Sequence, residues 1–179
     1  MRSIYLLLAL AATAQTFGQD KKLFFETALR LGTDAEMVFI GPAISAGAGI
    51  NLGDYVSVST SYTFYYSRIS GPETFLTHTV DLVPVFQFQN PFRKGHGLYI
   101  GVGPAWQYRR QAPEELMVEK PRYWLAAFNL GYRFTPILCG KERALAVDLK
   151  GFGPYKQNEP DGQYVEVLTQ LMLGVRLRF

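Results

Sequence analysis

Apolar and polar residues alternate along most of the chain, and the alternation is clearest at its C-terminal end. From Leu171 to Phe179 every second side chain is large and apolar, and the residues between them include Arg176 and Arg178. A two-residue period places successive side chains on opposite faces of a β-strand. The pattern therefore predicts a strand that runs to the last residue and whose two faces meet very different surroundings.

The same alternation occurs in seven further segments, so the sequence predicts eight strands. These are Leu23 to Leu31, Pro42 to Leu52, Tyr55 to Tyr66, Phe75 to Gln89, Leu98 to Tyr108, Arg122 to Phe134, Ala144 to Tyr155, and Gln163 to Phe179. Most exceed the roughly five or six residues of an ordinary strand. They reach the roughly 9 to 11 residues that a tilted strand needs to cross a bilayer.

The two faces of these strands differ in composition. Apart from Arg122 at a strand end, one face carries aliphatic and aromatic residues without any Asp, Glu, Lys or Arg, and the other combines Gly and Ser with charged residues. The charged residues are Glu26, Arg30, Asp81, Arg109, Arg133, Asp148, Lys150, Glu166 and Arg176. The bore of an eight-stranded barrel is just wide enough for its side chains, so the bulky face fits the outside better. The sequence thus predicts an all-β fold, an eight-stranded antiparallel up-and-down transmembrane β-barrel, with a soluble lipocalin-like barrel as the alternative.

The charged residues of the inward face are predicted to form an ion-pair network that fills the lumen. A narrow lumen cannot hydrate them all, and charges in a medium of low dielectric constant need partners. A small water-filled pore is the alternative, although open porins use about 16 to 18 strands.

The ends of the strands predict how the barrel lies in a membrane. If both mature termini lie on the same side, the Trp and Tyr residues collect at the far end, and Phe residues that include Phe179 collect at the near end. Two aromatic belts are typical of membrane barrels. Pro84 falls near the middle of its strand, where it removes a ladder hydrogen bond, and we expect a β-bulge there.

The N-terminal segment predicts export, and the composition excludes several classes of protein. The first 18 residues have a basic residue followed by a short apolar run and small residues, which predicts a signal peptide (1–18) ahead of a barrel domain (19–179). Cys139 is the single cysteine, so an intrachain disulfide cannot form. The formal net charge is only +3 and basic residues do not cluster with aromatic ones, so nucleic acid is not an expected partner.

His78 is the only candidate catalytic residue, and it is a weak one. Membrane barrels that act on lipid A need a His together with a hydroxyl nucleophile and a carboxylate, and Thr77, Thr79 and Asp81 are near His78 in sequence. The deacylase pattern of a Ser two residues after the His is absent, because Val80 stands there. His96, in a turn, is expected to be solvated. Metal-ligand spacing is absent, and no cofactor is expected.

Two segments carry a resemblance to a known family. The stretch VDLVPVFQFQNPFRKGHGLYIGVGPAW (Val80 to Trp106) and the terminal GVRLRF resemble the small outer-membrane β-barrels of Gram-negative bacteria, the OmpA/OmpX type and the outer membrane beta-barrel domain proteins of Bacteroidota. The resemblance implies a place in the outer membrane with both mature termini in the periplasm, in contact with its lipids and lipopolysaccharide. It also implies recognition by the barrel-assembly machinery. The residues of that assembly signal would be Leu171, Leu173, Val175, Leu177 and Phe179.

The sequence therefore favours a monomeric, non-enzymatic barrel of the cell envelope with a structural, adhesive or surface-interaction role. A lipid-A-modifying enzyme and a small, porin-like channel for ions or solutes are the alternatives.

Overall fold

The computed structural model describes residues 23–34, 40–68, 74–93, 95–112, 122–135, 137–138, 141–142, 144–153, 157–158, 164–165 and 170–179. Every regular element in these ranges is a β-strand. In this part of the chain, no helix has the length and apolar character to cross a membrane. The predicted signal peptide, Cys139, Tyr155 and Glu166 lie outside the described residues.

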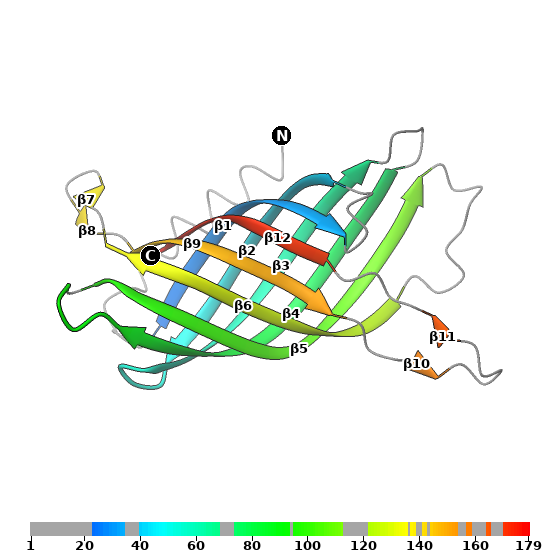
Figure 1. Cartoon of the computed structure of the whole chain (residues 1–179). Helices are drawn as coiled ribbons and strands as arrows, with labels where there is room; N and C mark the ends of the chain where they lie inside the picture. Colours follow the sequence, from blue (N-terminus) through cyan, green and yellow to red (C-terminus); the bar gives the residue numbers. More distant parts are fainter. Residues whose placement is uncertain are drawn as a thin grey trace.

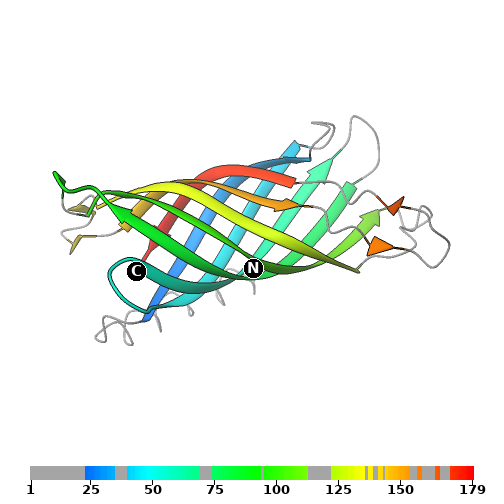
Figure 2. The same ribbon diagram turned by 60° about the horizontal axis from the view of Figure 1, so that its bottom comes forward.

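Eight long strands form a closed antiparallel barrel, which confirms the predicted fold. Their order around the barrel is β1-β12-β9-β6-β5-β4-β3-β2, and Figures 1 and 2 show them running obliquely around its axis. The strands are β1 (Leu23–Asp34), β2 (Ile40–Asn51), β3 (Val56–Arg68), β4 (Thr74–Gln89), β5 (Gly97–Ala112), β6 (Arg122–Phe134), β9 (Ala144–Gly153) and β12 (Gln170–Arg178). We call the end that holds Leu23 and Phe179 the near end, and the opposite end the far end.

The last residue of the chain takes part in closing the barrel. Strand β12 pairs with β1 in a continuous register that includes Leu29 opposite Val175, and the two strands lie side by side in Figure 1. Beyond the last strand residue, the Phe179 backbone N–H donates to the Phe25 carbonyl at 2.8 Å, and the Phe25 N–H donates to the Phe179 carbonyl at 3.3 Å. Phe179 thus extends the seam between the first and last strands.

The start of the last strand was predicted wrongly. Barrel pairing of β12 begins at Gln170, which is opposite Phe152 of β9 and Asp34 of β1. Strand β11 (Tyr164–Val165) pairs instead with β10 (Gln157–Asn158) in a separate two-stranded sheet. A strand continues only where neighbours supply hydrogen bonds, and β9 ends at Gly153. A second small sheet joins β7 (Ile137–Leu138) to β8 (Lys141–Glu142) in a predicted turn.

The bulge expected at Pro84 is absent. Strand β3 pairs with β4 without a break, and Val58 lies opposite Pro84. Pairing between β4 and β5 stops after Asp81 opposite Ala105 and resumes in the same register at Val85 opposite Gly101. Both Pro84 and Pro104 fall in this gap, and neither has a backbone N–H to donate. The pairing of β4 with β5 therefore lacks hydrogen bonds locally, but neither strand has the extra residue that defines a β-bulge.

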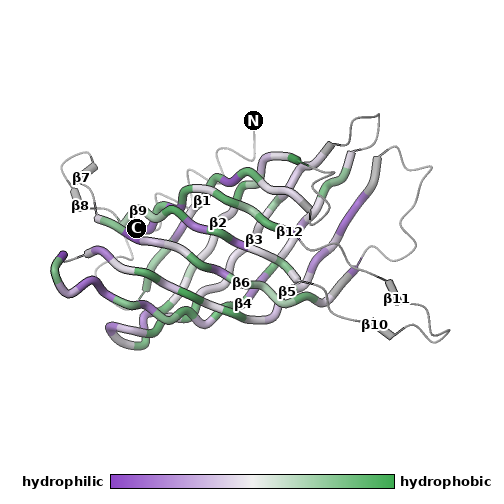
Figure 3. Tube along the Cα trace, viewed as in Figure 1, coloured by the Kyte–Doolittle hydropathy of each residue, from purple (hydrophilic) through white to green (hydrophobic). Residues whose placement is uncertain are grey.

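The two faces of the strands have the predicted orientations. Large apolar side chains point outward, as Leu29 and Val147 show with exposed fractions of 68% and 48%, whereas most charged residues on the other face are buried. Figure 3 shows hydrophobic and hydrophilic residues alternating along single strands. The barrel is therefore apolar outside and substantially polar inside, the pattern of a membrane barrel.

Candidate functional site

A buried carboxylate at the centre of the lumen binds two arginines. Asp148 of β9 accepts hydrogen bonds from Arg30 of β1, Nε to Oδ1 at 3.0 Å and Nη2 to Oδ2 at 2.9 Å. The side chains of Arg30 and Asp148 are 1% and 0% exposed. Arg176 of β12 forms a second ion pair with the same carboxylate. A bidentate, charge-assisted contact of this kind fixes the geometry as well as compensating the charge.

A second buried ion pair lies across the lumen. The Lys150 ammonium of β9 contacts Asp81 of β4 at 2.5 Å. It also donates to the hydroxyls of Ser61 at 2.6 Å and Thr63 at 3.2 Å, both on β3. Ser61 in turn donates to the Asp81 carboxylate at 2.9 Å. All three donors of the ammonium are therefore used.

Hydroxyl groups connect the two ion pairs. Arg30 Nη1 donates to Ser45 Oγ of β2 at 2.6 Å. The Ser45 and Thr63 hydroxyl oxygens are 2.9 Å apart, and Thr63 contacts Lys150. The result is one buried network that spans the lumen and ties together strands from opposite walls. We call this set the central network: Arg30, Ser45, Ser61, Thr63, Asp81, Asp148, Lys150 and Arg176.

Glu26 binds two arginines towards the near end. Its carboxylate is 3.2 Å from Arg176 Nη1 and 3.4 Å from Arg178 Nη2. Arg178 was not among the predicted lumen charges, although it has the same strand parity as Arg176. That parity was the signal that could have found it. Arg176 therefore links Glu26 to the central network through Asp148.

Two predicted lumen cations are not part of these ion pairs. The guanidinium of Arg109 lies over the Phe75 ring at 4.0 Å. Arg133, at the near end of the barrel, donates to Gln87 Oε1 of β4. The position of Glu166 is outside the described residues. The structure thus brings six of the nine predicted charges together: Glu26, Arg30, Asp81, Asp148, Lys150 and Arg176.

Large apolar side chains also occupy the lumen, which the sequence pattern did not indicate. Tyr65, Phe152 and Met172 are each at most 1% exposed and belong to one buried cluster. Gly32 makes this possible, because an added Cβ would lie 2.8 Å from the Tyr65 ring and 3.0 Å from Met172. Gln107 adds polar contacts beside them, to Thr79 at 3.1 Å and to Gln170 at 3.0 Å. The described lumen is therefore packed with side chains as well as charged.

His78 lies on the outer wall, apart from its predicted partners. Its Nδ1 is 2.5 Å from the Tyr62 hydroxyl, and its ring lies against Phe64 and Tyr108. Thr77, Thr79 and Asp81 have the opposite parity and are buried in the lumen. Among the described residues, His78 is hydrogen-bonded to neither a Ser or Thr hydroxyl nor a carboxylate. A triad of His78 with the neighbouring Thr and Asp residues is therefore not formed.

Two further sequence expectations concern His96 and metal binding. His96 has intermediate exposure in the turn. Its Nδ1 is 3.2 Å from the Tyr132 hydroxyl in an exposed contact, and its ring packs near Phe134. Within the described ranges, no group of three or more His, Cys, Asp or Glu side chains is placed to hold a metal ion.

Comparison with known proteins adds information on the fold. No protein-family model matches the sequence, and no curated protein shows significant similarity to it. Among solved structures, Neisserial surface protein A is similar at a TM-score of 0.59 and 10% identity, covering 87% of this chain and 94% of that one. The N-terminal β-barrel domain of Pseudomonas aeruginosa OprF gives a TM-score of 0.51 and 16% identity over 87% and 97% of the two chains.

The outer membrane enzyme PagL has the same architecture, with a TM-score of 0.52 and 9% identity over 86% of this chain and 98% of that one. Identities this low establish the fold alone. Since one fold hosts both an enzyme and a surface protein by their names, the activity has to be inferred from this chain's own residues.

Proposed function

We propose that this protein is an integral outer-membrane β-barrel without enzymatic activity, with a structural, adhesive or surface-interaction role. The observation that carries this proposal is the orientation of the side chains. Apolar side chains form the exposed wall and the ionic network is buried in the lumen, the reverse of a water-soluble barrel. Water would have to solvate a wall of aliphatic side chains such as Leu29, Leu82 and Leu173, each more than half exposed. Lipid solvates the same wall without that cost.

The filled lumen supports a non-conducting barrel. Arg30, Lys150 and Asp148 occupy its centre with their charges paired, and the apolar cluster around Tyr65 and Phe152 fills a further section. A conducting pore needs a continuous hydrated path, and paired buried charges with apolar neighbours oppose one. The pore is therefore the weaker alternative.

The surroundings of His78 support the absence of lipid-A chemistry. A nucleophilic hydroxyl needs a base that is hydrogen-bonded to it and oriented by a third group. His78 is paired with a phenol, Tyr62, and packs between aromatic rings on the wall. This environment suits an aromatic belt residue, whose apolar ring and polar edge fit a membrane interface.

The proposed orientation places the near end in the periplasm, after removal of a signal peptide (1–18). The outer wall would contact the lipids and lipopolysaccharide of the outer membrane. A monomeric state is consistent with the closed barrel, because such a barrel has no free strand edge to pair with another chain. Insertion would depend on the barrel-assembly machinery, with Leu171, Leu173, Val175, Leu177 and Phe179 as the recognised residues.

Cell fractionation tests the proposal directly. The mature protein should sediment with the outer membrane and migrate faster on a gel when unheated than when boiled, since a closed barrel resists unfolding. Recovery as a soluble periplasmic protein would overturn the membrane assignment. Vesicles that contain the purified protein should be no more permeable to ions than empty ones, and lipid A from cells should be unchanged by its deletion. A gain in permeability would favour the pore, and an altered lipid A would favour the enzyme.

Deleting Phe179 tests the proposed assembly signal. The variant should be exported normally but accumulate unfolded in the periplasm, because it loses both the terminal aromatic ring and the last contacts with Phe25. Phe92→Ala, in the exposed near-end turn, is the matched control and should assemble at the normal rate. Normal assembly of the truncated chain would contradict the signal role and leave Phe179 as a closing residue of the ladder only.

A further inference from the structure

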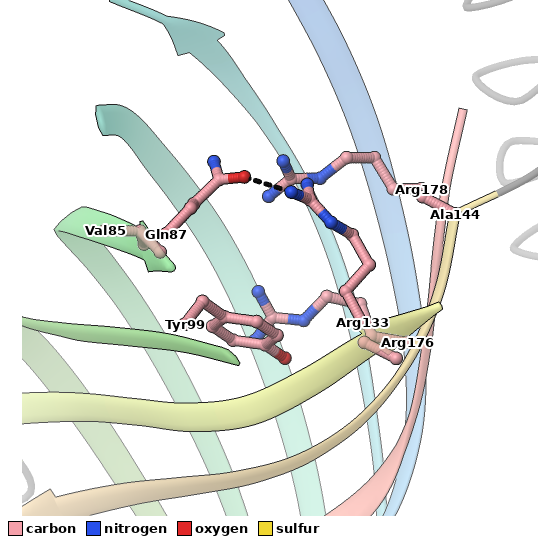
Figure 4. A pocket seen from close by; sticks show the side chains of 8 residues that line it. Val85, Gln87, Tyr99, Arg133, Ala144, Arg176 and Arg178 are labelled. Carbon is pink, nitrogen blue, oxygen red and sulfur yellow. Dashed lines mark hydrogen bonds between the residues drawn. The ribbon is translucent and has the colours of Figure 1, made fainter. Parts of the chain in front are cut away.

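A small cavity in the lumen at the near end is lined by three arginines and by no acidic residue. Its lining residues are Val85, Gln87, Tyr99, Arg133, Ala144, Ala146, Arg176 and Arg178. Figure 4 shows the side chains of Arg133, Arg176 and Arg178 converging from β6 and β12 opposite Gln87 and Tyr99. Three guanidinium groups therefore make the surroundings of the cavity positively charged, while carbon atoms form most of the surface that faces the space.

The carboxylates nearby do not balance these arginines. Glu26 is shared between Arg176 and Arg178, while Asp148 is shared between Arg176 and Arg30. Arg133 contacts only the neutral amide of Gln87 among the described residues. Among the described residues, two side-chain carboxylates thus pair with three arginines, Arg30, Arg176 and Arg178, and Arg133 pairs with neither. Arg133 and Arg178 are of intermediate exposure, and a partly buried charge without compensation is costly, so a mobile anion would stabilise this end.

Two buried donors at the same cavity lack a hydrogen-bond partner within the described part of the chain. These are the Tyr99 hydroxyl and Arg176 Nε. Tyr99 is 6% exposed and Arg176 is 4% exposed, so bulk water does not readily satisfy them. Orphaned buried donors are rare in folded proteins and mark a place where a bound water or ion belongs.

We propose that this cavity binds one small inorganic anion, a halide such as chloride. The cavity has space of about 10 Å³ for the centre of a water molecule, which corresponds to a single particle of that size. A halide meets this limit and accepts hydrogen bonds from several guanidinium groups at once, whereas phosphate or a sugar phosphate is too large. A water molecule would fit the space but would leave the positive charge uncompensated.

Anomalous diffraction from crystals that contain bromide tests where the ion binds. Crystals of the detergent-solubilised barrel grown in bromide should show an anomalous peak within hydrogen-bonding distance of Arg133 and Arg178, and the peak should be absent from Arg133→Gln crystals. Density for water alone at this place in the native protein would overturn the proposal.

Salt-dependent stability tests whether the ion matters in solution. At equal ionic strength, the unfolding midpoint of the native barrel should be about 2–4 °C higher in chloride than in gluconate, which is too large for the cavity. Arg133→Gln should lose this difference. Arg122→Gln, which removes an exposed arginine on the outer wall, should retain it.

Equal midpoints of the native protein in the two salts would overturn the proposal without any variant. A chloride effect retained in Arg133→Gln would place the ion elsewhere and would also overturn it. A bromide peak in crystals without any chloride effect in solution would indicate binding at crystal concentration only, and would count against a site of physiological use. None of these outcomes depends on the surface role proposed above.

Discussion

The centre of the lumen and its near end balance buried charge in different ways. In the central network, Asp148 meets Arg30 at 2.9 Å and Asp81 meets Lys150 at 2.5 Å, and hydroxyls accept further hydrogen bonds from Arg30 and Lys150. At the near end, three arginines line one cavity without an acidic neighbour in its wall. The difference teaches that both acidic side chains of the centre pair directly with cations, whereas the wall of the near-end cavity holds cations without a carboxylate. Arg133, at the near end, has the neutral amide of Gln87 as its hydrogen-bond partner among the described residues.

Removing the shared carboxylate of the central network should have the largest effect. Asp148→Leu leaves Arg30 and Arg176 without a common partner in a buried site, and we expect a loss of about 3–5 kcal/mol in the free energy of unfolding. Urea titration of the barrel in lipid vesicles measures it. Asp54→Leu, in an exposed near-end turn, is the control. Similar losses in both variants would mean that water reaches the centre.

Breaking the second ion pair should cost less when both partners are replaced together. Lys150→Met alone leaves Asp81 buried and unpaired, and should destabilise the barrel by about 3 kcal/mol. The double variant Lys150→Met with Asp81→Leu should lose only about 1 kcal/mol, because an apolar pair can substitute for a buried ion pair. A double-mutant cycle measures the coupling. Additive losses would show that the two residues do not interact.

A steric change at the near end should have an intermediate effect. A Cβ on Gly131 would lie 2.5 Å from the Tyr99 hydroxyl oxygen, so Gly131→Ala should displace the Tyr99 ring from the cavity wall. We expect a loss of about 1–3 kcal/mol, as for other overpacked sites. Gly53→Ala is the control, because nothing lies within 4 Å of its added Cβ. An unchanged unfolding curve for Gly131→Ala would mean that Tyr99 adjusts freely.

Arg133→Gln should have the smallest effect when the anion is absent. The variant loses one hydrogen bond to Gln87 but no ion pair, so the expected loss in gluconate is about 1 kcal/mol or less. Arg30→Gln, in the central network, should cost several times more because it leaves Asp148 with one partner fewer. Equal losses for the two arginine variants would remove the distinction between the centre and the near end.

Strand parity allowed much of this arrangement to be predicted from the sequence. It assigned Leu29 and Val147 to the wall and Arg30 and Asp148 to the lumen. Applied to His78, which has the parity of Val80, the same rule would have placed that side chain on the wall. Applied to Arg178, it would have added the missing lumen cation. It was less useful for Tyr65, Phe152 and Met172, because a lumen expected to be small and charged gave no reason to look for large apolar residues in it.

The sequence by itself determined the number of long strands, their antiparallel order and the face on which each side chain lies, because a period of two residues is a local property of an extended backbone. Only the tertiary structure decided which charges pair. Arg30 and Asp148 are 118 residues apart, and their contact depends on the register of several strands and on the closure of β12 against β1. The same closure gathers Arg133, Arg176 and Arg178 from β6 and β12 around one cavity. Local periodicity sets the direction of a side chain, whereas its partner is set by the cumulative stagger of the whole barrel.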